Sequence, residues 1–321
     1  MIIITGAAGF IGSCVTAHLQ NLGYKDLVLV DDFSIPAKQP NFIHREKTVL
    51  VNRDEFIPWL SGKSNQVEII IHLGARTNTA EFDEHLLERL NTAYSKAIWT
   101  WCTENQIPLI YASSAATYGD GHLGYSDDPG KIPSLIPLNP YGWSKQRFDM
   151  WVLAQKETPF FWAGLKFFNV YGPNEYHKGR MASVIFHAYN QIKETGKVKL
   201  FKSHREEYKN GEQLRDFVYV KDVVSVIQYL MENRPVSGIF NLGTGKARTF
   251  LDLTHAVFKS MGTHPDIEFM DIPEDIRNTY QYYTQAEMDK LIHSGYTIPF
   301  TPLEEGIADY VQSYLTSHKI W

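Results

Sequence analysis

Tyr141 and Lys145 are the first residues whose types and spacing suggest a reaction. They lie four residues apart, which on a helix places the phenol and the ammonium group on one face. A cation beside a tyrosine favours the phenolate and lowers the pKa of the phenol, which can then exchange a proton with an alcohol or a ketone. The spacing alone is not specific, because Tyr189 and Lys193 repeat it, and we interpret that second pair as an ordinary helix face.

A pair of serines precedes Tyr141 at the end of a short apolar run. Ser113 and Ser114 belong to the segment Tyr111–Gly119, and a proline-rich stretch separates this segment from Tyr141. A hydroxyl group at this place can donate to the reacting oxygen and steady it as carbonyl character develops. We select Ser114 for this role. Capping or turn formation is the structural alternative for either serine.

Three glycines near the start of the chain predict a nucleotide-binding turn. Gly6, Gly9 and Gly12 follow the apolar run Ile2–Thr5 and precede an amphipathic stretch. Glycine permits a tight turn and a close backbone approach, and the N-terminus of the following helix offers N–H groups to a pyrophosphate. A compact turn between a strand and a helix is the structural alternative, but the position in the first βα unit favours the dinucleotide.

The sequence indicates a dinucleotide cofactor but does not decide whether its ribose carries a 2′-phosphate. Asp31 follows the second predicted strand, where an acid accepts a hydrogen bond from a ribose hydroxyl group, which favours NAD. Lys38 and Arg53 lie in loops that could reach the same ribose and neutralise a 2′-phosphate, or could simply face solvent. The small residues of the segment 72–75 close the fourth predicted strand, and there we expect contact with the cofactor.

These residues need a parallel sheet to bring them together. Short apolar runs alternate with stretches of helical periodicity through the first half, which predicts a parallel sheet with helices on both faces. The predicted strands are Ile2–Thr5, Leu27–Val30, Thr48–Val51, Glu68–His72, Pro108–Ala112 and Ala163–Phe167. The predicted helices lie near residues 10–22, 54–61, 83–104 and 140–155.

The alternation changes after about Tyr171, where longer polar connections separate helices and short strands. We interpret residues 172–321 as mainly a smaller α/β substrate-binding lobe. Residues 1–171 then form the nucleotide-binding domain, to which later segments return. The fold class expected is α/β, with a doubly wound parallel sheet.

Composition excludes several other classes of protein. The chain has 321 residues, 44% of them hydrophobic, and a net charge of −5, which does not suggest a surface for nucleic acid. Only Cys14 and Cys102 occur, so neither a disulfide framework nor a structural zinc site is expected, and a reducing compartment fits. The sequence shows no leader and no apolar run of about 18 residues. We therefore expect a soluble, cytoplasmic protein.

Together these motifs resemble the extended short-chain dehydrogenase/reductase family over essentially the whole chain. The resemblance implies a Rossmann domain, a nicotinamide cofactor, and a catalytic trio of Ser114, Tyr141 and Lys145. The motifs that carry it are TGAAGFIG at Thr5–Gly12, SSAATYG at Ser113–Gly119, YGWSK at Tyr141–Lys145 and FFNVYGP at Phe167–Pro173.

A narrower resemblance is to the ADP-glycero-manno-heptose 6-epimerases, which supply a precursor of bacterial lipopolysaccharide. It implies that a tightly held NADP oxidises the C6″ alcohol of the sugar to a ketone and returns hydride to the other face. Tyr141 and Lys178 match the two residues that act as acid and base in those epimerases. The resemblance also implies a homo-oligomer, for example a pentamer. The segments that carry this resemblance are Phe168–Pro173, His177–Gly179, Met181–Val184, Arg215–Val220, Phe240–Gly245, Tyr280–Gln281 and Thr284–Ala286.

The same resemblance assigns further positions. Those implied to contact NADP, with NAD as the alternative, are Gly6, Gly9, Phe10, Ile11, Gly12, Asp31, Asp32, Lys38, Arg53, Leu73, Gly74, Ala75, Arg76, Thr77, Asn91, Tyr141, Lys145, Val170 and Lys178. Those implied to contact the nucleotide sugar are Ser114, Asn169, Arg180, His187, Phe201, Lys202, Ser203, His204, Arg215 and Tyr280. No metal is needed for this chemistry.

Several positions depart from the pattern of the resemblance. Asp32 replaces an expected asparagine beside Asp31, Arg180 replaces a serine, residues 76–79 differ from the usual run, and the segment 205–214 is longer. These changes lie at the edges of the predicted cofactor and substrate sites.

The alternative functions are another nucleotide-sugar epimerase or reductase, or a non-catalytic protein that responds to NADP. A dehydratase is disfavoured, because the two alanines after Ser114 stand where an acidic pair would be expected to drive elimination. Without the resemblance, Lys178 could be a loop lysine that holds phosphate, and His187 an ordinary surface or core histidine.

Overall fold

Seven strands form one parallel sheet in the computed structural model, which describes residues 1–79, 81–277 and 280–321. The strand order is β10-β6-β5-β4-β1-β2-β3, and each pair of neighbours is parallel. This confirms the expected α/β fold with a doubly wound parallel sheet. The strands are β1 (Ile2–Thr5), β2 (Leu27–Asp31), β3 (Thr48–Asn52), β4 (Ile69–His72), β5 (Leu109–Ser114), β6 (Trp162–Phe167) and β10 (Gly238–Leu242).

The six predicted strands are all present, and their ends differ from the prediction by no more than two residues. All residues of β1, β2 and β4 are buried, as expected of central parallel strands that are covered on both faces. The seventh strand, β10, comes from late in the chain and pairs with β6, with Gly238 opposite Ala163.

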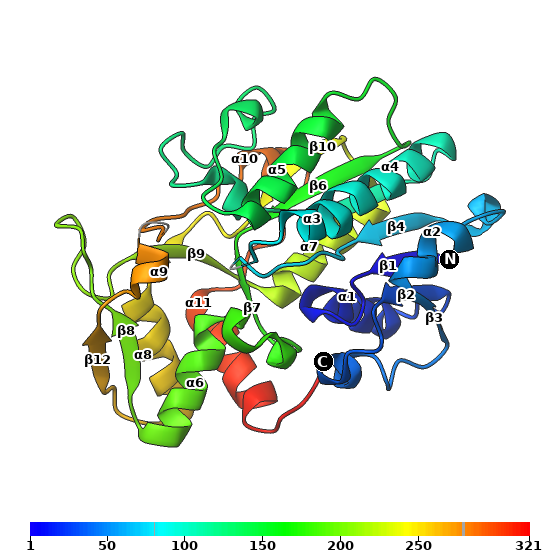
Figure 1. Cartoon of the computed structure of the whole chain (residues 1–321). Helices are drawn as coiled ribbons and strands as arrows, with labels where there is room; N and C mark the ends of the chain where they lie inside the picture. The colour runs from blue at the N-terminus through cyan, green and yellow to red at the C-terminus, as the bar shows by residue number, and fades with distance from the viewer. Residues whose placement is uncertain (80, 278–279) are drawn as a thin grey trace.

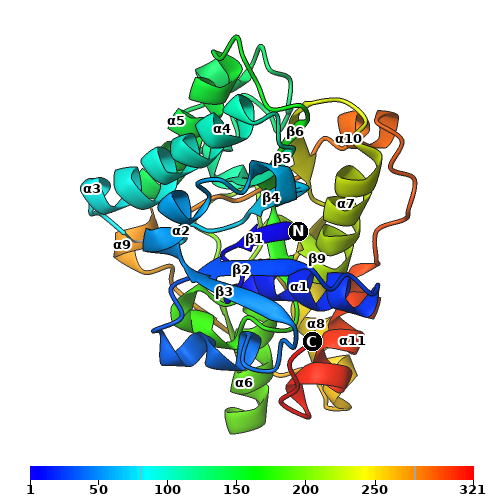
Figure 2. The same ribbon diagram turned by 90° about the vertical axis from the view of Figure 1, so that its right-hand side faces the viewer.

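Helices cover both faces of this sheet, as Figure 2 shows, with α1 and α7 on one side and α4 and α5 on the other. Because all seven strands are parallel, their carboxyl ends lie at one edge of the sheet. These helices are α1 (Phe10–Asn21), α2 (Arg53–Trp59), α3 (Glu84–Leu87), α4 (Tyr94–Glu104), α5 (Pro140–Leu153) and α7 (Val220–Asn233).

The helix predicted over residues 83–104 is divided by a wider turn. α3 and α4 are joined by a π-helical segment, Glu88–Ala93, in which Asn91 is buried. The Asn91 amide contacts the loop after β4, and the Ser95 hydroxyl donates to the carbonyl of Asn91. The polar contacts of one buried asparagine thus account for the irregular turn, which apolar periodicity did not reveal.

A smaller group of elements lies beside the carboxyl edge of the sheet, at the lower left of Figure 1. Two small sheets form its centre: a three-stranded sheet of order β11-β9-β7, and the parallel pair β8 and β12. The elements are β7 (Asn169–Tyr171), α6 (Val184–Thr195), β8 (Val198–Phe201), β9 (Leu214–Tyr219), β11 (Ala247–Thr249), α8 (Phe250–Met261), β12 (Ile267–Met270), α9 (Glu274–Arg277) and α11 (Leu303–Asp309).

The remaining short elements connect these parts. α10 (Asp289–His293) lies near β10 in Figure 1 and donates to it, because the Lys290 ammonium contacts the carbonyl of Ile239 at 2.7 Å. The short helical turns are Pro36–Asn41, Ser64–Gln66, Ala115–Tyr118, Ile132–Ser134, Tyr176–Met181 and the π-helical turn Tyr310–Leu315.

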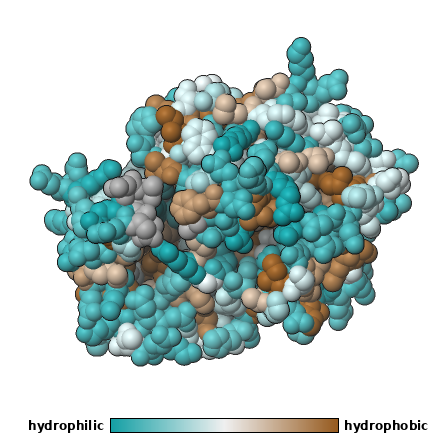
Figure 3. All heavy atoms as spheres, in the orientation of Figure 1, coloured by the Kyte–Doolittle hydropathy of each residue, from teal (hydrophilic) through white to brown (hydrophobic). Residues whose placement is uncertain are grey.

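One continuous apolar core extends from the main sheet into the smaller group of elements. The face seen in Figure 3 is mostly hydrophilic, with hydrophobic residues in small scattered groups. Both cysteines are buried and free. Of the helices described, none combines the length and apolar character needed to span a bilayer.

His72, at the end of β4, links three elements inside this core. Its Nδ1 lies 2.6 Å from the Thr5 hydroxyl oxygen in β1, and its Nε2 lies 2.9 Å from the Ser95 hydroxyl oxygen in α4. Burial, with a smaller contribution from the Lys145 cation, lowers the pKa of His72 to about 3. The folded protein therefore holds a neutral imidazole at pH values where an exposed histidine is protonated.

We expect acid to destabilise the fold through His72. Below a pKa of about 6.5 the unfolded chain takes up a proton that the folded chain does not, so stability falls by about 1.4 kcal/mol per pH unit and by about 2–3 kcal/mol at pH 4.5. Urea unfolding at pH 7.0 and 4.5 measures the loss, and His72→Asn should show a smaller one. The exposed His255→Asn is the control and should behave as the wild type does. Equal losses in all three proteins would contradict this assignment.

Candidate functional site

Several residues selected from the sequence lie at the carboxyl ends of the strands of the main sheet, whose arrangement Figure 1 shows. Gly6 follows β1, Leu73 follows β4, and Ser114 is the last residue of β5. Asp31 is the last residue of β2. This is the edge at which open α/β sheets bind their ligands.

The glycine turn and the loop after β4 approach each other so closely that side chains would not fit. Gly6 has φ of +68°, and a Cβ atom on it would lie 2.7 Å from the backbone nitrogen of Gly74. A Cβ atom on Gly12 would lie 2.1 Å from the Gly6 carbonyl oxygen. Gly9 is the N-cap of α1 and has no side chain to cap the first N–H groups. Such a cradle of backbone N–H groups fits the pyrophosphate of a dinucleotide.

The Asp31 carboxylate already has protein partners. It accepts from the Ala8 backbone N–H at 2.9 Å and forms an ion pair of 2.8 Å with Lys38. Arg53 pairs with Asp32 at 3.3 Å. Neither Lys38 nor Arg53 simply faces solvent, because both lie against the two carboxylates that follow β2.

Asn91 fixes the loop after β4 to the rest of the site. It accepts from the Arg76 backbone N–H at 2.7 Å and donates to the Arg76 carbonyl at 3.0 Å. It also donates to the Ser144 hydroxyl in α5 at 2.9 Å. The Arg76 side chain pairs with Glu81 at 3.0 Å, while Ala75 and Thr77 lie on either side of Arg76 in this loop.

The first turn of α5 brings Tyr141 to Ser114. Asn139 caps the helix by accepting from the Gly142 backbone N–H at 2.8 Å, and Pro140 occupies the first helical position. Tyr141 is buried, and the Ser114 side chain is close enough to it to lower the pKa of the phenol. The Ser114 hydroxyl also accepts from the Ala116 backbone N–H at 3.1 Å, so the capping alternative and the contact with Tyr141 are both present.

The electrostatics of the phenol differ from the sequence prediction. Burial raises the pKa of Tyr141 above its ordinary value, although the hydrogen bond with Ser114 lowers it. Burial also lowers the pKa of Lys145 to about 8, and its Nζ donates to the Ala112 carbonyl at 2.9 Å. The expected lowering of the phenol pKa is therefore wrong, because the desolvation of the buried Tyr141 outweighs the contact with Ser114, which acts in the opposite direction.

Lys178 belongs to the turn Tyr176–Met181, which follows β7, and lies against the first turn of α1. Its Nζ is 5.2 Å from the centre of the Phe10 ring, in the first turn of α1. Burial lowers the pKa of Lys178, while the negative charge of Glu175 opposes this shift. Asn174 anchors the segment, because it donates to the Ser13 hydroxyl at 3.0 Å and accepts from the Trp321 backbone N–H at 2.8 Å.

The predicted substrate residues fall into separate groups. In the first, the Arg215 guanidinium lies 5.3 Å from the centre of the Tyr280 ring, which meets Phe201 edge to face. Arg215 donates to the Gln281 carbonyl, and Gln281 donates to the Gly119 carbonyl at the end of the Ser114 segment. This group is thus connected to the reactive end of the site.

The other predicted substrate residues do not belong to the group formed by Arg215, Tyr280 and Phe201. Lys202 and His204 lie near Asp271, at 3.7 and 3.9 Å, with Ser203 between them in the chain. The imidazole of His187 lies 3.4 Å from the Arg180 carbonyl oxygen. Asn169 is exposed and Val170, its neighbour in β7, is half-buried.

Sequence reasoning missed a buried ion pair beneath the reactive end. Lys166 in β6 and Asp149 in α5 are both fully buried, with 2.7 Å between Nζ and Oδ2. Two signals could have identified them: Asp149 lies four residues after Lys145, and Lys166 is a single cation in an otherwise apolar strand.

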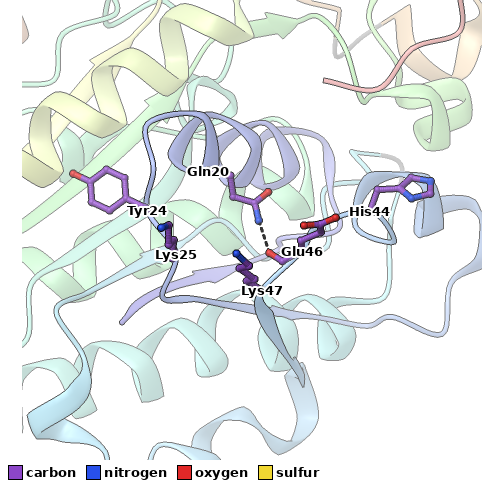
Figure 4. Close-up of a pocket in the computed structure, with 6 residues that line it drawn as sticks. All are labelled: Gln20, Tyr24, Lys25, His44, Glu46 and Lys47. Atoms are coloured by element: carbon purple, nitrogen blue, oxygen red, sulfur yellow. Dashed lines mark hydrogen bonds between the residues drawn. The ribbon is translucent and has the colours of Figure 1, made fainter.

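A shallow pocket elsewhere is unrelated to this site. Gln20, Tyr24, Lys25, His44, Glu46 and Lys47 line it, and Gln20 donates to the Glu46 carbonyl (Figure 4). Its residues precede β2 and β3, so it lies at the amino edge of the sheet. Among the described residues, no three His, Cys, Asp or Glu side chains are grouped to hold a metal ion.

Comparison with known proteins shows what this arrangement is similar to. An ADP-L-glycero-D-manno-heptose-6-epimerase of Fusobacterium nucleatum is 50% identical over 326 residues, covering 98% of each chain. A protein of the same name from Nitratidesulfovibrio vulgaris strain DP4 is 46% identical over 325 residues, 99% of this chain and 98% of that one. The crystal structure of the Helicobacter pylori ADP-L-glycero-D-manno-heptose-6-epimerase matches with a TM-score of 0.83 and 27% identity over 97% of this chain and 95% of the other.

These similarities confirm the narrower resemblance that the motifs indicated. Residues 2–243 also match the model of a family described as NAD dependent epimerase/dehydratase. That span contains the glycine cradle, Ser114, Tyr141, Lys145 and Lys178. A nicotinamide dinucleotide is the cofactor class of this family and fits the cradle. The chain belongs to the NAD dependent epimerase/dehydratase family.

Proposed function

We propose that this protein is an epimerase that inverts C6″ of ADP-glycero-manno-heptose, through transient oxidation of the C6″ alcohol to a ketone. The near-full-length identity of 50% with the Fusobacterium nucleatum epimerase carries the proposal. Two observations support it: Tyr141 is buried in the first turn of α5, and the half-buried Lys178 lies against Phe10 in the first turn of α1.

NADP is the cofactor that we propose. The cradle at Gly6, Gly9 and Gly12 would hold the pyrophosphate, and Lys38 and Arg53 would hold the 2′-phosphate. Their existing pairs with Asp31 and Asp32 support this, because each cation already offsets a carboxylate that would repel the phosphate. When bound, the nicotinamide supplies a reversible hydride acceptor.

Inversion needs proton transfer on two sides of the carbon, since the hydroxyl group points differently before and after. Tyr141 would exchange the hydroxyl proton on one side, with Ser114 donating to the same oxygen and Lys145 stabilising the phenolate. Lys178 would exchange the proton on the other side. The lowered pKa of Lys178 supports this role, because a neutral amine accepts a proton.

The nucleotide sugar would lie between the main sheet and the smaller group of elements. Arg215 and Tyr280 would contact the diphosphate, supported by their mutual contact and their connection through Gln281 to Gly119. The other positions that we propose for substrate contact are Asn169, Arg180, His187, Phe201, Lys202, Ser203 and His204.

We also propose that residues 1–171 form the cofactor-binding domain and that residues 172–321 form mainly the substrate-binding lobe. We propose that the protein is a homo-oligomer, for example a pentamer. Sedimentation equilibrium would measure the number of subunits.

The proposed activity is tested by incubating the purified protein with ADP-D-glycero-D-manno-heptose without added cofactor. We expect both epimers to appear, as resolved by NMR of the C6″ proton, and deuterium at C6″ to be retained. UDP-glucose and UDP-N-acetylglucosamine tested in parallel should remain unchanged. Epimerisation of a UDP-sugar alone would favour the alternative epimerase, and no turnover of any substrate would contradict the proposal.

Removal of either proton-transfer group should abolish most of the activity. Tyr141→Phe and Lys178→Met should each lower kcat about 10²–10⁴-fold, because each removes one acid/base group. Circular dichroism should show that both variants fold. Tyr189→Phe and Lys193→Met are the matched controls, since they alter the second pair of the same spacing on α6, and they should keep normal rates. Normal rates in Lys178→Met would remove its assigned role.

Lys38 should make the protein bind NADP more tightly than NAD. In Lys38→Met the Asp31 carboxylate loses its ion pair and would face the 2′-phosphate directly. The Kd for NADP should then rise about 10–100-fold, while the Kd for NAD changes little. Calorimetric titration of cofactor-stripped protein measures both constants. Lys25→Met, an exposed lysine before β2, should change neither of them. Equal weakening of both cofactors would show that Lys38 does not recognise the phosphate.

A further inference from the structure

The reactive segment after β5 rests on a buried polar network that contains one ion pair. The Lys166 ammonium lies 2.7 Å from the Asp149 carboxylate, and both side chains are inaccessible to solvent. Burying two charges in this way costs solvation that their attraction barely repays, so such a pair is weak evidence for a stabilising role. Its directional contacts suggest a different role.

The Lys166 ammonium contacts Asp149, Thr117 and Tyr118, and Thr117 connects it to Ser114. Its Nζ donates to Asp149 and to the Thr117 hydroxyl, each at 2.7 Å, and lies 5.2 Å from the centre of the Tyr118 ring. The Thr117 hydroxyl in turn donates to the Ser114 carbonyl at 2.8 Å. One hydroxyl group therefore joins the ammonium to the backbone of Ser114.

Asp149 holds the same segment from the other side. Its Oδ2 accepts from the Ser113 hydroxyl at 2.6 Å, and its Oδ1 accepts from the Tyr111 hydroxyl at 3.2 Å. Asp149 also lies one helical turn after Lys145 in α5, the helix that carries Tyr141. The carboxylate thus ties the end of β5 to the helix that presents the phenol.

We propose that Thr117, Lys166 and Asp149 are positioning residues that fix the backbone of Ser114 against Tyr141. This rests on the proposed function, in which Ser114 and Tyr141 meet the same substrate oxygen. None of the three needs to touch the substrate. They affect the reaction by fixing the position of the Ser114 hydroxyl group. A displacement of this group by about 1 Å is enough to lower the rate about 10²-fold.

Thr117 is the residue to change, because it can be altered without leaving either buried charge alone. Thr117→Val keeps the branched shape and replaces the hydroxyl group with a methyl group, whereas Thr117→Ser keeps the hydroxyl group. We expect kcat to fall about 10–100-fold in Thr117→Val with KM for ADP-heptose within about twofold of the wild-type value. Thr117→Ser should recover most of the rate.

A matched control removes a buried threonine hydroxyl elsewhere. Thr254 in α8 is fully buried, and its hydroxyl group has no hydrogen-bond partner within the described parts of the chain. Thr254→Val should leave kcat and KM unchanged. A second readout does not need activity: with ¹³Cζ-labelled tyrosine, the NMR signal assigned through Tyr141→Phe should move in Thr117→Val and stay in place in Thr254→Val.

The outcomes separate the two proposals. A wild-type protein without turnover would contradict the proposed function, and the tyrosine signal would still test the positioning role. With an active wild type, an unchanged kcat in Thr117→Val together with an unmoved Tyr141 signal would overturn the positioning role. Equal loss of rate in Thr117→Val and Thr117→Ser would overturn it as well, because the hydroxyl group would then not be the cause.

Discussion

The contact between the glycine turn after β1 and the loop after β4 is the constraint on which the rest of the site depends. Gly6 and Gly74 meet backbone to backbone, and Gly12 lets the first turn of α1 pack onto the Gly6 carbonyl. Any side chain at these positions would separate the two loops. Because the strands they follow are neighbours in the sheet, this contact determines where α1 begins and where its N–H groups point.

Around this backbone cradle the site is built largely from buried polar groups. Burial lowers the pKa of Lys145 to about 8, and it also lowers the pKa of Lys178. Asp149 and Lys166 form an ion pair in which both side chains are fully buried. The site thus combines two lysines whose pKa values are lowered by burial with a third, Lys166, which is held by hydrogen bonds to Asp149 and Thr117.

Much of the fold was predictable from the sequence. The strands β1 to β4 are short runs rich in β-branched residues, and a run such as Ile2–Thr5 is consistent with a buried parallel strand in the α/β alternation. β10 was harder to predict, because nothing in its local sequence says that it pairs with β6, about 75 residues earlier. The π-helical turn at Asn91 could not be predicted from the local sequence either, because Asn91 contacts Arg76 in a loop distant in the chain.

The sequence by itself determined the nucleotide turn, the serine segment, the Tyr141–Lys145 pair and the family resemblance, because these depend on residue types at short spacing. Only the tertiary structure decided that Lys38 pairs with Asp31, that Lys178 lies against Phe10, and that Lys166 reaches Thr117 and Asp149. It also decided the direction of the Tyr141 pKa, which follows from burial. Desolvation and long-range pairing depend on which distant segments surround a group, and short-range spacing holds no information on that.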